Sequence, residues 1–175
     1  MSLLPDVVGE TPLVVFCGMA NLCSPLRHDH HYGGPGNAFW RLLHSSGLTE
    51  DRLEPADDVR LPAYGLGVTD LVVERAPDVP RRTHVDDLAS KVEGWSPEWL
   101  AMTSKTVAAE LARCLGHRPP GLGITGWDLA GAPVFVLPGP SGANQRREYD
   151  GRPDRLSWWT DLAALVGRGP DAAGA

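Results

Sequence analysis

The sequence predicts an α/β domain built as a three-layer α/β/α sandwich, with a central sheet between helices. Two observations predict this fold class. Short continuous apolar runs, typical of buried parallel strands, recur along the chain, and segments with helical spacing of apolar residues separate them. The length of 175 residues is that of one domain. We expect residues 1–175 to form it, with a frayed tail over residues 167–175.

Four segments are predicted to be strands. The first is Leu13–Cys17, an apolar run that stops at Gly18. The others are Tyr64–Val73, Trp99–Met102 and Val134–Leu137. Because ligands of such sheets bind beyond the carboxyl ends of the strands, we expect the chemistry in the loops after Cys17, around Asp70 and after Leu137.

The helices are predicted from apolar spacing and from residues that start or end a helix. One helix begins near Phe39 and can end at Gly47. Thr83 is the candidate N-cap of a second helix, whose apolar face includes Leu88 and Val92. The last two predicted helices are Thr106–Leu115 and Leu156–Val166.

Charge, hydropathy and cysteine content exclude several classes of protein. The net charge is −6, so any contact with nucleic acid must use a local basic patch. No apolar run approaches the ~20 residues that span a bilayer, and Met1–Glu10 lacks the features of a secretory signal, so we expect no membrane contact. The 3 cysteines form neither a disulfide framework nor a four-thiolate cluster, which favours the reducing cytoplasm.

Other short motifs are interpreted without a cofactor or a metal. Gly121–Gly126 has the spacing of a dinucleotide-binding motif but follows prolines instead of a strand, so we interpret it as a glycine-rich turn. His28–His31 offers ligand types for zinc without the usual separated spacing, and we interpret it as a polar loop on the rim of a cleft. Arg81 and Arg82 are interpreted as a solvated turn. We therefore expect neither a metal nor a cofactor.

Several stretches of sequence, taken together, resemble a known family. They are Val14–Cys23, Tyr32–Trp40, Gly65–Val72 and Val136–Asn144. In this order and spacing the chain resembles the uracil-DNA glycosylase superfamily over most of residues 13–147, and it is most similar to the branch of mismatch-specific uracil/thymine-DNA glycosylases. The resemblance implies a mostly parallel four-stranded sheet between helices. It also implies hydrolysis of the glycosidic bond of a pyrimidine that is flipped out of duplex DNA, with no metal or cofactor.

The resemblance assigns the base pocket to residues near the first strand and to one aromatic residue. They are Gly18, Met19, Ala20, Leu22 and Tyr32. Tyr32 matches the aromatic residue that stacks on the flipped base, the alternative being an aromatic side chain on a surface loop. Backbone groups around Met19 and Tyr32 are expected to bond the pyrimidine edge and stabilise the departing uracil. Leu22 stands where this branch has glycine and strictly uracil-selective relatives have tyrosine, so we expect efficient excision of uracil and poor excision of thymine.

The residue that positions the attacking water in the family is an asparagine, and this sequence has Ala20 in its place. Asn21 follows one position later, and Asp70 stands where the family commonly has a neutral or basic residue. We prefer Asp70 as the catalytic residue, because a carboxylate both stabilises an oxocarbenium-like transition state and orients or deprotonates water. Asn21 is the second candidate, and an ion pair between Asp70 and Arg75 is the alternative without catalysis. Asn37, at the start of the following helix, is expected to tie the loop or cap the helix.

The loop after the fourth predicted strand matches the family's insertion loop, which fills the gap left by the flipped base. Its predicted DNA-binding residues are Ser141, Gly142, Ala143, Asn144, Gln145 and Arg146. Family members usually have a larger apolar residue at the position of Ala143 and a basic one at that of Gln145, so we expect a slighter wedge here. The Asn144 amide is expected to contact the opposite base. Arg146 and Arg147 are expected to contact phosphates, the alternative being a solvated turn.

These features favour a monofunctional, monomeric DNA glycosylase that removes uracil, or related damaged or mismatched pyrimidines, from double-stranded DNA. Two alternatives stay open. The first is a protein that binds damaged DNA without turnover, because Ala20 replaces the family's asparagine. The second is a hydrolase of free nucleosides, in which an insertion loop would serve no purpose.

Overall fold

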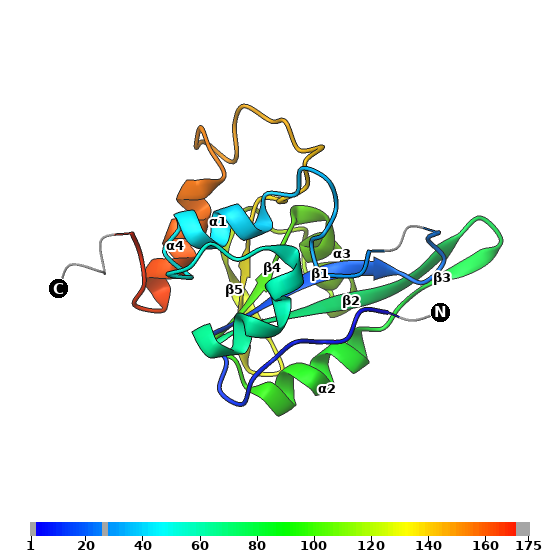
Figure 1. Ribbon diagram of the computed structural model, residues 1–175. Helices are drawn as coiled ribbons and strands as arrows, with labels where there is room; N and C mark the ends of the chain where they lie inside the picture. The colour runs from blue at the N-terminus through cyan, green and yellow to red at the C-terminus, as the bar shows by residue number, and fades with distance from the viewer. Residues whose placement is uncertain (1–2, 26–27, 171–175) are drawn as a thin grey trace.

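A mixed, mostly parallel sheet forms the middle layer of the protein (Figure 1). The computed structural model describes residues 3–25 and 28–170. Its sheet has six strands in the order β3-β2-β1-β4-β6-β5. The strands are β1 (Val14–Asn21), β2 (Leu66–Ala76), β3 (Val79–Thr83), β4 (Trp99–Met102), β5 (Gly123–Leu129) and β6 (Ala132–Val136). The strands β2, β1, β4 and β6 run parallel, whereas β3 and β5 are antiparallel edges.

The α/β class is confirmed, but the expectation of a four-stranded sheet is wrong because both edges carry an additional strand. Strand β3 returns along β2, and it is mostly exposed, so it shows no apolar pattern. Gly121–Gly126, interpreted as a glycine-rich turn, instead overlaps β5, which begins at Gly123. A two-residue turn joins β5 to β6, and both of its residues, Ala130 and Gly131, have positive φ angles of 50° and 84°. Such a turn matches the twist of the strands that it joins.

Helices cover both faces of the sheet, as the sequence predicted. They are α1 (Phe39–Ser45), the 3-10 helix η1 (Pro55–Tyr64), α2 (Val85–Trp95), α3 (Lys105–Leu115) and α4 (Leu156–Leu165). Thr83 does not cap α2, because it is the last residue of β3 and His84 takes the N-cap position. The start of the tail after α4 is anchored to the fold, because Arg168 Nη1 donates to the carbonyl of Leu48 at 2.9 Å. Residues 171–175 of the predicted frayed tail lie outside the described residues.

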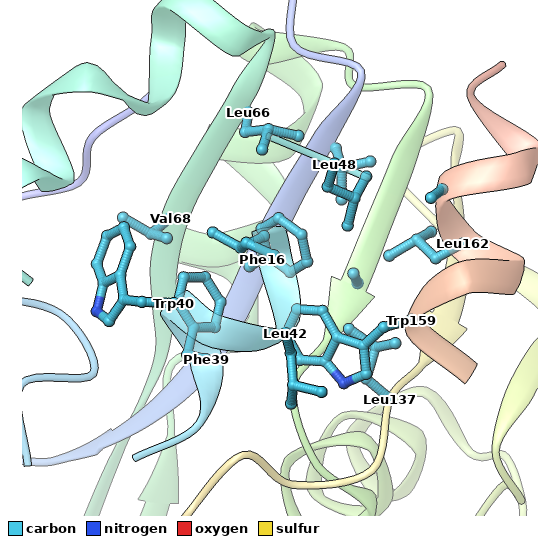
Figure 2. Close-up of a cluster of buried hydrophobic side chains, with 14 of the residues drawn as sticks. Phe16, Phe39, Trp40, Leu42, Leu48, Leu66, Val68, Leu137, Trp159 and Leu162 are labelled. Atoms are coloured by element: carbon cyan, nitrogen blue, oxygen red, sulfur yellow. The ribbon is translucent and has the colours of Figure 1, made fainter. Parts of the chain in front are cut away.

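Two apolar cores lie on the two faces of the sheet because successive side chains of a strand point to opposite sides. Phe16 of β1 packs with Phe39 and Trp40 of α1 and Trp159 of α4 (Figure 2). The alternate residues of β1, Val15 and Cys17, pack with residues of α2 and α3 in the second core. No helix in the described part of the chain is long and apolar enough to cross a membrane.

The parallel strands end at different levels, and this step positions the site. Strand β4 pairs with β1 only as far as Cys17 opposite Met102. Beyond that point β1 continues to Asn21 with β2 as its partner, and Gly18 lies opposite Asp70. The expectation that the first strand ends at Cys17 is therefore corrected. The early end of β4 leaves space beside the last residues of β1.

Candidate active site

A cavity of about 670 Å³ opens where β1 and β2 extend past β4. Its walls come from the N-terminal segment, the end of β1, the loop before α1, Asp70 of β2 and the loop after β6. The sequence-predicted residues that line it are Met19, Ala20, Asn21, Leu22, Tyr32, Asn37, Asp70, Ser141 and Gly142. The structure thus brings together residues that lie far apart in the sequence. The remaining predicted loop residues, Ala143 to Arg146, line a neighbouring depression of about 510 Å³.

Asp70 approaches β1 at Gly18, where the absence of a side chain leaves room for the carboxylate. A Cβ atom on Gly18 would lie 2.6 Å from Asp70 Oδ1 and 3.2 Å from Tyr32 Oη. Contacts of 2.6 Å between a Cβ and an oxygen would force the carboxylate to move. Gly18 therefore has a packing role in the site: it lets the Asp70 carboxylate and the Tyr32 hydroxyl converge.

The Asp70 carboxylate is partly buried and has no hydrogen-bond or ion-pair partner among the described residues. Burial raises its pKa, and the charge of Asp6 raises it further, while His31 and Lys91 act in the opposite direction. Arg75, the alternative partner, pairs with Glu110 instead, at 3.4 Å between Nη2 and Oε2. A carboxylate withdrawn from water without a partner is costly, and such groups are concentrated at functional sites.

Two contacts hold the Tyr32 side chain in place. Its ring stacks on Phe39, with centroids 3.9 Å apart and an interplanar angle of 10°. Its hydroxyl donates to Thr103 Oγ1 at 3.2 Å, and Thr103 in turn donates to the carbonyl of Cys17 at 3.2 Å. The backbone has φ 54°, a left-handed conformation that is strained for a non-glycine residue and typical of functional sites. Burial, together with Asp70, raises the pKa of Tyr32, so the hydroxyl stays neutral.

Asn21 lines the cavity, but its amide is already engaged. Its Nδ2 donates to the carbonyl of Arg75 at 3.1 Å. Its Oδ1 accepts from the backbone N–H of Arg75 at 3.2 Å and from that of Cys23 at 3.1 Å. These bonds tie the end of β1 to the β2–β3 hairpin. Of the two candidates to replace the family's asparagine, Asp70 is the one whose functional group has no hydrogen-bond or ion-pair partner among residues 3–25 and 28–170.

The loop before α1 is held by its own polar side chains. Asn37 Oδ1 accepts from the backbone N–H of Phe39 at 3.0 Å, which covers the first turn of α1. His31 is buried, and its Nε2 lies 2.8 Å from the carbonyl of Pro5. His30 Nδ1 lies 3.2 Å from Asp58 Oδ2. The histidines interpreted as a polar loop therefore anchor the cavity wall, and no group of three or more metal-ligating side chains is found among the described residues.

The loop after β6 is braced internally and leaves several side chains exposed. The Ala38 N–H donates to the carbonyl of Pro140 at 2.8 Å, which fastens the loop beside the cavity. Asn144 Nδ2 donates to the carbonyl of Gly139 at 2.9 Å. The predicted contact of the Asn144 amide with an opposite base would thus compete with a bond that shapes the loop. Ser141, Ala143, Gln145 and Arg146 are exposed.

Sequence reasoning missed several residues that build this site. Leu3 and Leu4 line the cavity from the N-terminal segment, which joins the sheet through a bridge between Val7 and Val68. Thr103 holds Tyr32, and it follows β4 directly. Neither feature has a sequence signal, because each depends on contacts between distant segments.

A cavity of this size at the carboxyl edge of a parallel sheet is typical of the class of α/β proteins that bind a small ligand at that edge. Within that class, the chain belongs to the uracil-DNA glycosylase superfamily, whose family model matches residues 5–163. A solution NMR structure of a candidate uracil DNA glycosylase from Methanosarcina acetivorans shows the same fold. It has a TM-score of 0.61 and 20% sequence identity, and the match covers 94% of this chain and 96% of that chain. Membership implies a hydrolase of N-glycosidic bonds with a DNA substrate, and it suggests uracil-DNA glycosylase activity in base-excision repair.

Proposed function

We propose that the protein is a monofunctional, mismatch-specific uracil-DNA glycosylase that acts as a monomer and needs no metal or cofactor. It removes uracil from duplex DNA and leaves an abasic site. The observation that carries the proposal is the Asp70 carboxylate, which lies near Tyr32 in a cavity of about 670 Å³ and has no partner within the described part of the chain. Pockets for small ligands are commonly about 300–1,000 Å³, so a pyrimidine nucleotide fits.

In this proposal the uracil is extruded from the helix and stacks on Tyr32. Stacking on an aromatic ring contributes about 1–3 kcal/mol per base. Backbone groups near Met19 and Tyr32 bond the pyrimidine edge. They also stabilise the negative charge that develops on the base, as an oxyanion hole does.

Asp70 acts on the sugar side of the scissile bond. The bond from C1′ to the base nitrogen breaks, and its electron pair leaves with uracil. A water oxygen bonds to C1′, and the proton that it loses passes to the Asp70 carboxylate. The same negative charge stabilises the oxocarbenium-like sugar before the water attacks. A carboxylate with a raised pKa is a stronger base than an ordinary aspartate, which suits this task.

The loop after β6 enters the stack in place of the extruded nucleotide. Its small residues, from Ser141 to Ala143, limit the cost of separating the bases. Arg146 and Arg147 contact phosphates nearby, in spite of the acidic net charge of the protein. Strand cleavage by lyase chemistry is not expected, because the lysines Lys91 and Lys105 are ion-paired with Asp6 and Asp150 and neither lines the cavity.

The direct test is a gel assay with an oligonucleotide duplex that carries one uracil. We expect strand breaks only after alkali treatment, because the enzyme leaves an intact backbone at the abasic site. Deoxyuridine as a free nucleoside serves as the control substrate and should not be hydrolysed. An intact strand after alkali, or turnover of the free nucleoside alone, would contradict the proposal.

The choice of base is expected to depend on Leu22. This side chain lines the cavity, and its backbone N–H is fixed to the carbonyl of Val73 at 2.9 Å. Leucine is bulkier than the glycine of this branch, so the 5-methyl group of thymine fits poorly. Rates on U:G, U:A, single-stranded U and T:G substrates should place T:G last, and an equal rate on T:G and U:G would refute this selectivity.

One observation favours a second candidate function. Ala20 lies in the cavity at the position of the family's water-positioning asparagine. A protein that only recognises damaged DNA would bind a duplex containing an abasic analogue with high affinity and show no turnover of uracil. The gel assay above separates this function from excision.

A further inference from the structure

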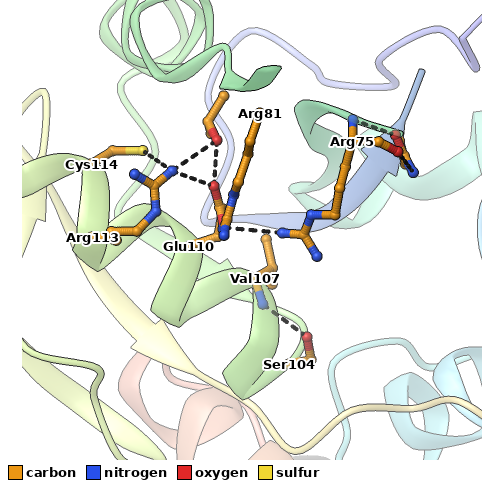
Figure 3. A network of polar contacts seen from close by, with 9 residues as sticks. Arg75, Arg81, Ser104, Val107, Glu110, Arg113 and Cys114 are labelled. Carbon is orange, nitrogen blue, oxygen red and sulfur yellow. Dashed lines mark hydrogen bonds and ion pairs between the residues drawn. The ribbon is translucent and has the colours of Figure 1, made fainter. Parts of the chain in front are cut away.

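Arginines from three elements converge on one buried carboxylate, Glu110 of α3 (Figure 3). Arg113 Nη2 lies 2.7 Å from Oε1, and Arg75 Nη2 lies 3.4 Å from Oε2. Arg81 of β3 also pairs with Glu110, and the Thr83 hydroxyl donates to it. The interpretation of Arg81 as part of a solvated turn is therefore wrong. We call Arg75, Arg81 and Arg113 the arginine cluster.

The arginine cluster carries more positive charge than Glu110 can neutralise. The Glu110 side chain is 3% exposed, whereas those of Arg75, Arg81 and Arg113 are 47%, 44% and 54% exposed. Glu110 is the only acidic residue among the described residues that line the adjacent depression of about 590 Å³. Burial, followed by the charges of Arg75 and Arg113, lowers the pKa of Arg81. A local excess of cations in a protein of net charge −6 points to an anionic partner.

The candidate active site and the arginine cluster are linked by depressions that share lining residues. Ser141 lines both the cavity and the depression beside the loop after β6. Thr106, in the first turn of α3, lines both that depression and the one with the arginine cluster. On the other side, the backbone of Arg75 is bonded to Asn21, which lines the cavity. An extended polyanion that passes the cavity can therefore reach the guanidinium groups.

We infer that the arginine cluster binds backbone phosphates of the DNA that flanks the extruded nucleotide, and that Glu110 neutralises only part of the positive charge of the cluster. The inference rests on the proposed function. Guanidinium forks match phosphate oxygens, and the three half-exposed guanidinium groups around one buried carboxylate keep N–H donors free for such oxygens. A small free anion would bind at the arginine cluster alone. A DNA strand that occupies the cavity would also pass over the depressions between the cavity and the cluster, so DNA accounts for all of these features.

The test measures binding of an undamaged duplex as a function of salt. Arg75→Gln, Arg81→Gln and Arg113→Gln are compared with the unaltered protein by fluorescence anisotropy, from about 50 to 200 mM salt. Each lost phosphate contact should reduce the slope of log K against log salt by about 0.9 and weaken binding about five- to tenfold near 0.1 M salt. Arg60→Gln is the matched control, because Arg60 is 49% exposed, pairs with Asp51 and Asp57, and lies in η1, before the start of β2. It should leave slope and affinity unchanged.

Glu110→Gln separates phosphate binding from a purely structural role. The substitution removes the negative charge but keeps the size of the side chain. Phosphate binding predicts tighter association with DNA and a steeper salt dependence. Weaker or unchanged binding by Glu110→Gln would overturn the inference, provided that thermal melting shows a folded protein.

The outcomes for the inference and for the proposed function are distinct. If the arginine variants match Arg60→Gln in slope and affinity, the inference is wrong, even where the unaltered protein excises uracil. If they lose DNA binding but the unaltered protein excises no uracil, the inference holds and the proposed activity fails.

Discussion

Asp70 and Glu110 both carry carboxylates that are withdrawn from water, but they differ in the hydrogen-bond and ion-pair partners that surround them. Glu110 is almost fully buried and accepts from Thr83 and from the arginine cluster. Asp70 has no such partner among the described residues, and burial raises its pKa. Burying a charge is costly unless the charge is paired, so the pairing of Glu110 lowers the free-energy cost of its burial. The surroundings of Asp70 suit the proposed reaction, because a carboxylate without a partner among the described residues can accept a proton from water.

The largest expected effect is that of Asp70→Asn. We expect uracil excision to fall about 10²–10⁴-fold, the usual contribution of a positioned acid–base group. Because the variant removes an unpaired charge, its Tm should rise by about 2–4 °C, which is about 1 kcal/mol in a domain of this size. Single-turnover excision and thermal melting measure the two effects.

Asn21→Ala is the control for this prediction. It removes bonds between β1 and the hairpin and should lower stability, while Asp70 and its chemistry remain. Full activity of Asp70→Asn, or a greater loss of rate in Asn21→Ala, would reverse the assignment of the catalytic residue.

A second variant displaces the Asp70 carboxylate without changing its charge. In Gly18→Ala the new Cβ would stand 2.6 Å from Asp70 Oδ1, so the carboxylate must turn away. A displacement of about 1 Å at a reacting group costs about 10²-fold in rate, which is the loss we expect. Gly94→Ala is a suitable control, since nothing lies within 4 Å of its added Cβ. Equal rates for both variants would show that the Asp70 position is not critical.

The pH dependence should also distinguish Asp70 from an ordinary aspartate. Excision requires the ionised carboxylate, so the rate should fall about tenfold per pH unit below its pKa. Because burial raises that pKa, the fall should begin above the range of a solvated aspartate, about 3.9. A profile of kcat/KM against pH measures it, and a rate that stays constant down to about pH 4 would contradict the proposed base.

The free energy of unfolding depends on the same titration in the opposite direction: the Asp70 contribution favours the folded state at low pH, where the excision rate falls. The pKa of Asp70 is higher in the folded than in the unfolded chain, so the folded protein binds the proton more tightly. This group therefore stabilises the fold as pH falls from its folded pKa to its unfolded pKa, and the cost of its ionisation is fully present above the folded pKa. In Asp70→Asn this component of the pH dependence should vanish.

The smallest effect on excision is expected at the other carboxylate. Glu110→Ala removes charged hydrogen bonds, each of which contributes about 1.5–3 kcal/mol, but the half-exposed guanidinium groups can turn to water. We expect a net loss of about 1–3 kcal/mol in the free energy of unfolding and little change in the rate of bond cleavage at saturating DNA. Urea denaturation and single-turnover rates measure both. A loss of rate as large as that of Asp70→Asn would show that the two carboxylates do not have separate roles.

The parts of the fold that could be predicted from sequence are those that bury apolar side chains. Trp99–Met102 was predicted with its observed bounds, and the helix of α3 was predicted to within one residue, because each shows a continuous or periodic apolar pattern. Strands β3 and β5 were missed because edge strands bury little. Val79–Thr83 contains a proline and two arginines and is mostly exposed.

The candidate site could be predicted where it follows strand ends. Met19, Leu22, Tyr32 and Asp70 all line the cavity, as expected from the loops at the carboxyl edge of the sheet. The partners of Glu110 could not be found in this way. Its burial depends on arginines that lie about 30 residues earlier in the chain, and a glutamate on an amphipathic helix ordinarily faces solvent.

Helix α3 lines both the depression beside the loop after β6 and the depression with the arginine cluster. Because a helix is stiff, it holds these two parts of the surface at a fixed separation. Thr106 and Arg113 are held about 11 Å apart along the helix axis, which is about three steps along a DNA strand. The helix thus fixes the distance between the depression beside the loop after β6 and the arginine cluster. On the proposed function, a DNA strand that contacts both the loop after β6 and the arginine cluster has to cover at least this distance, so a duplex that ends close to the lesion would lose its contact with the cluster.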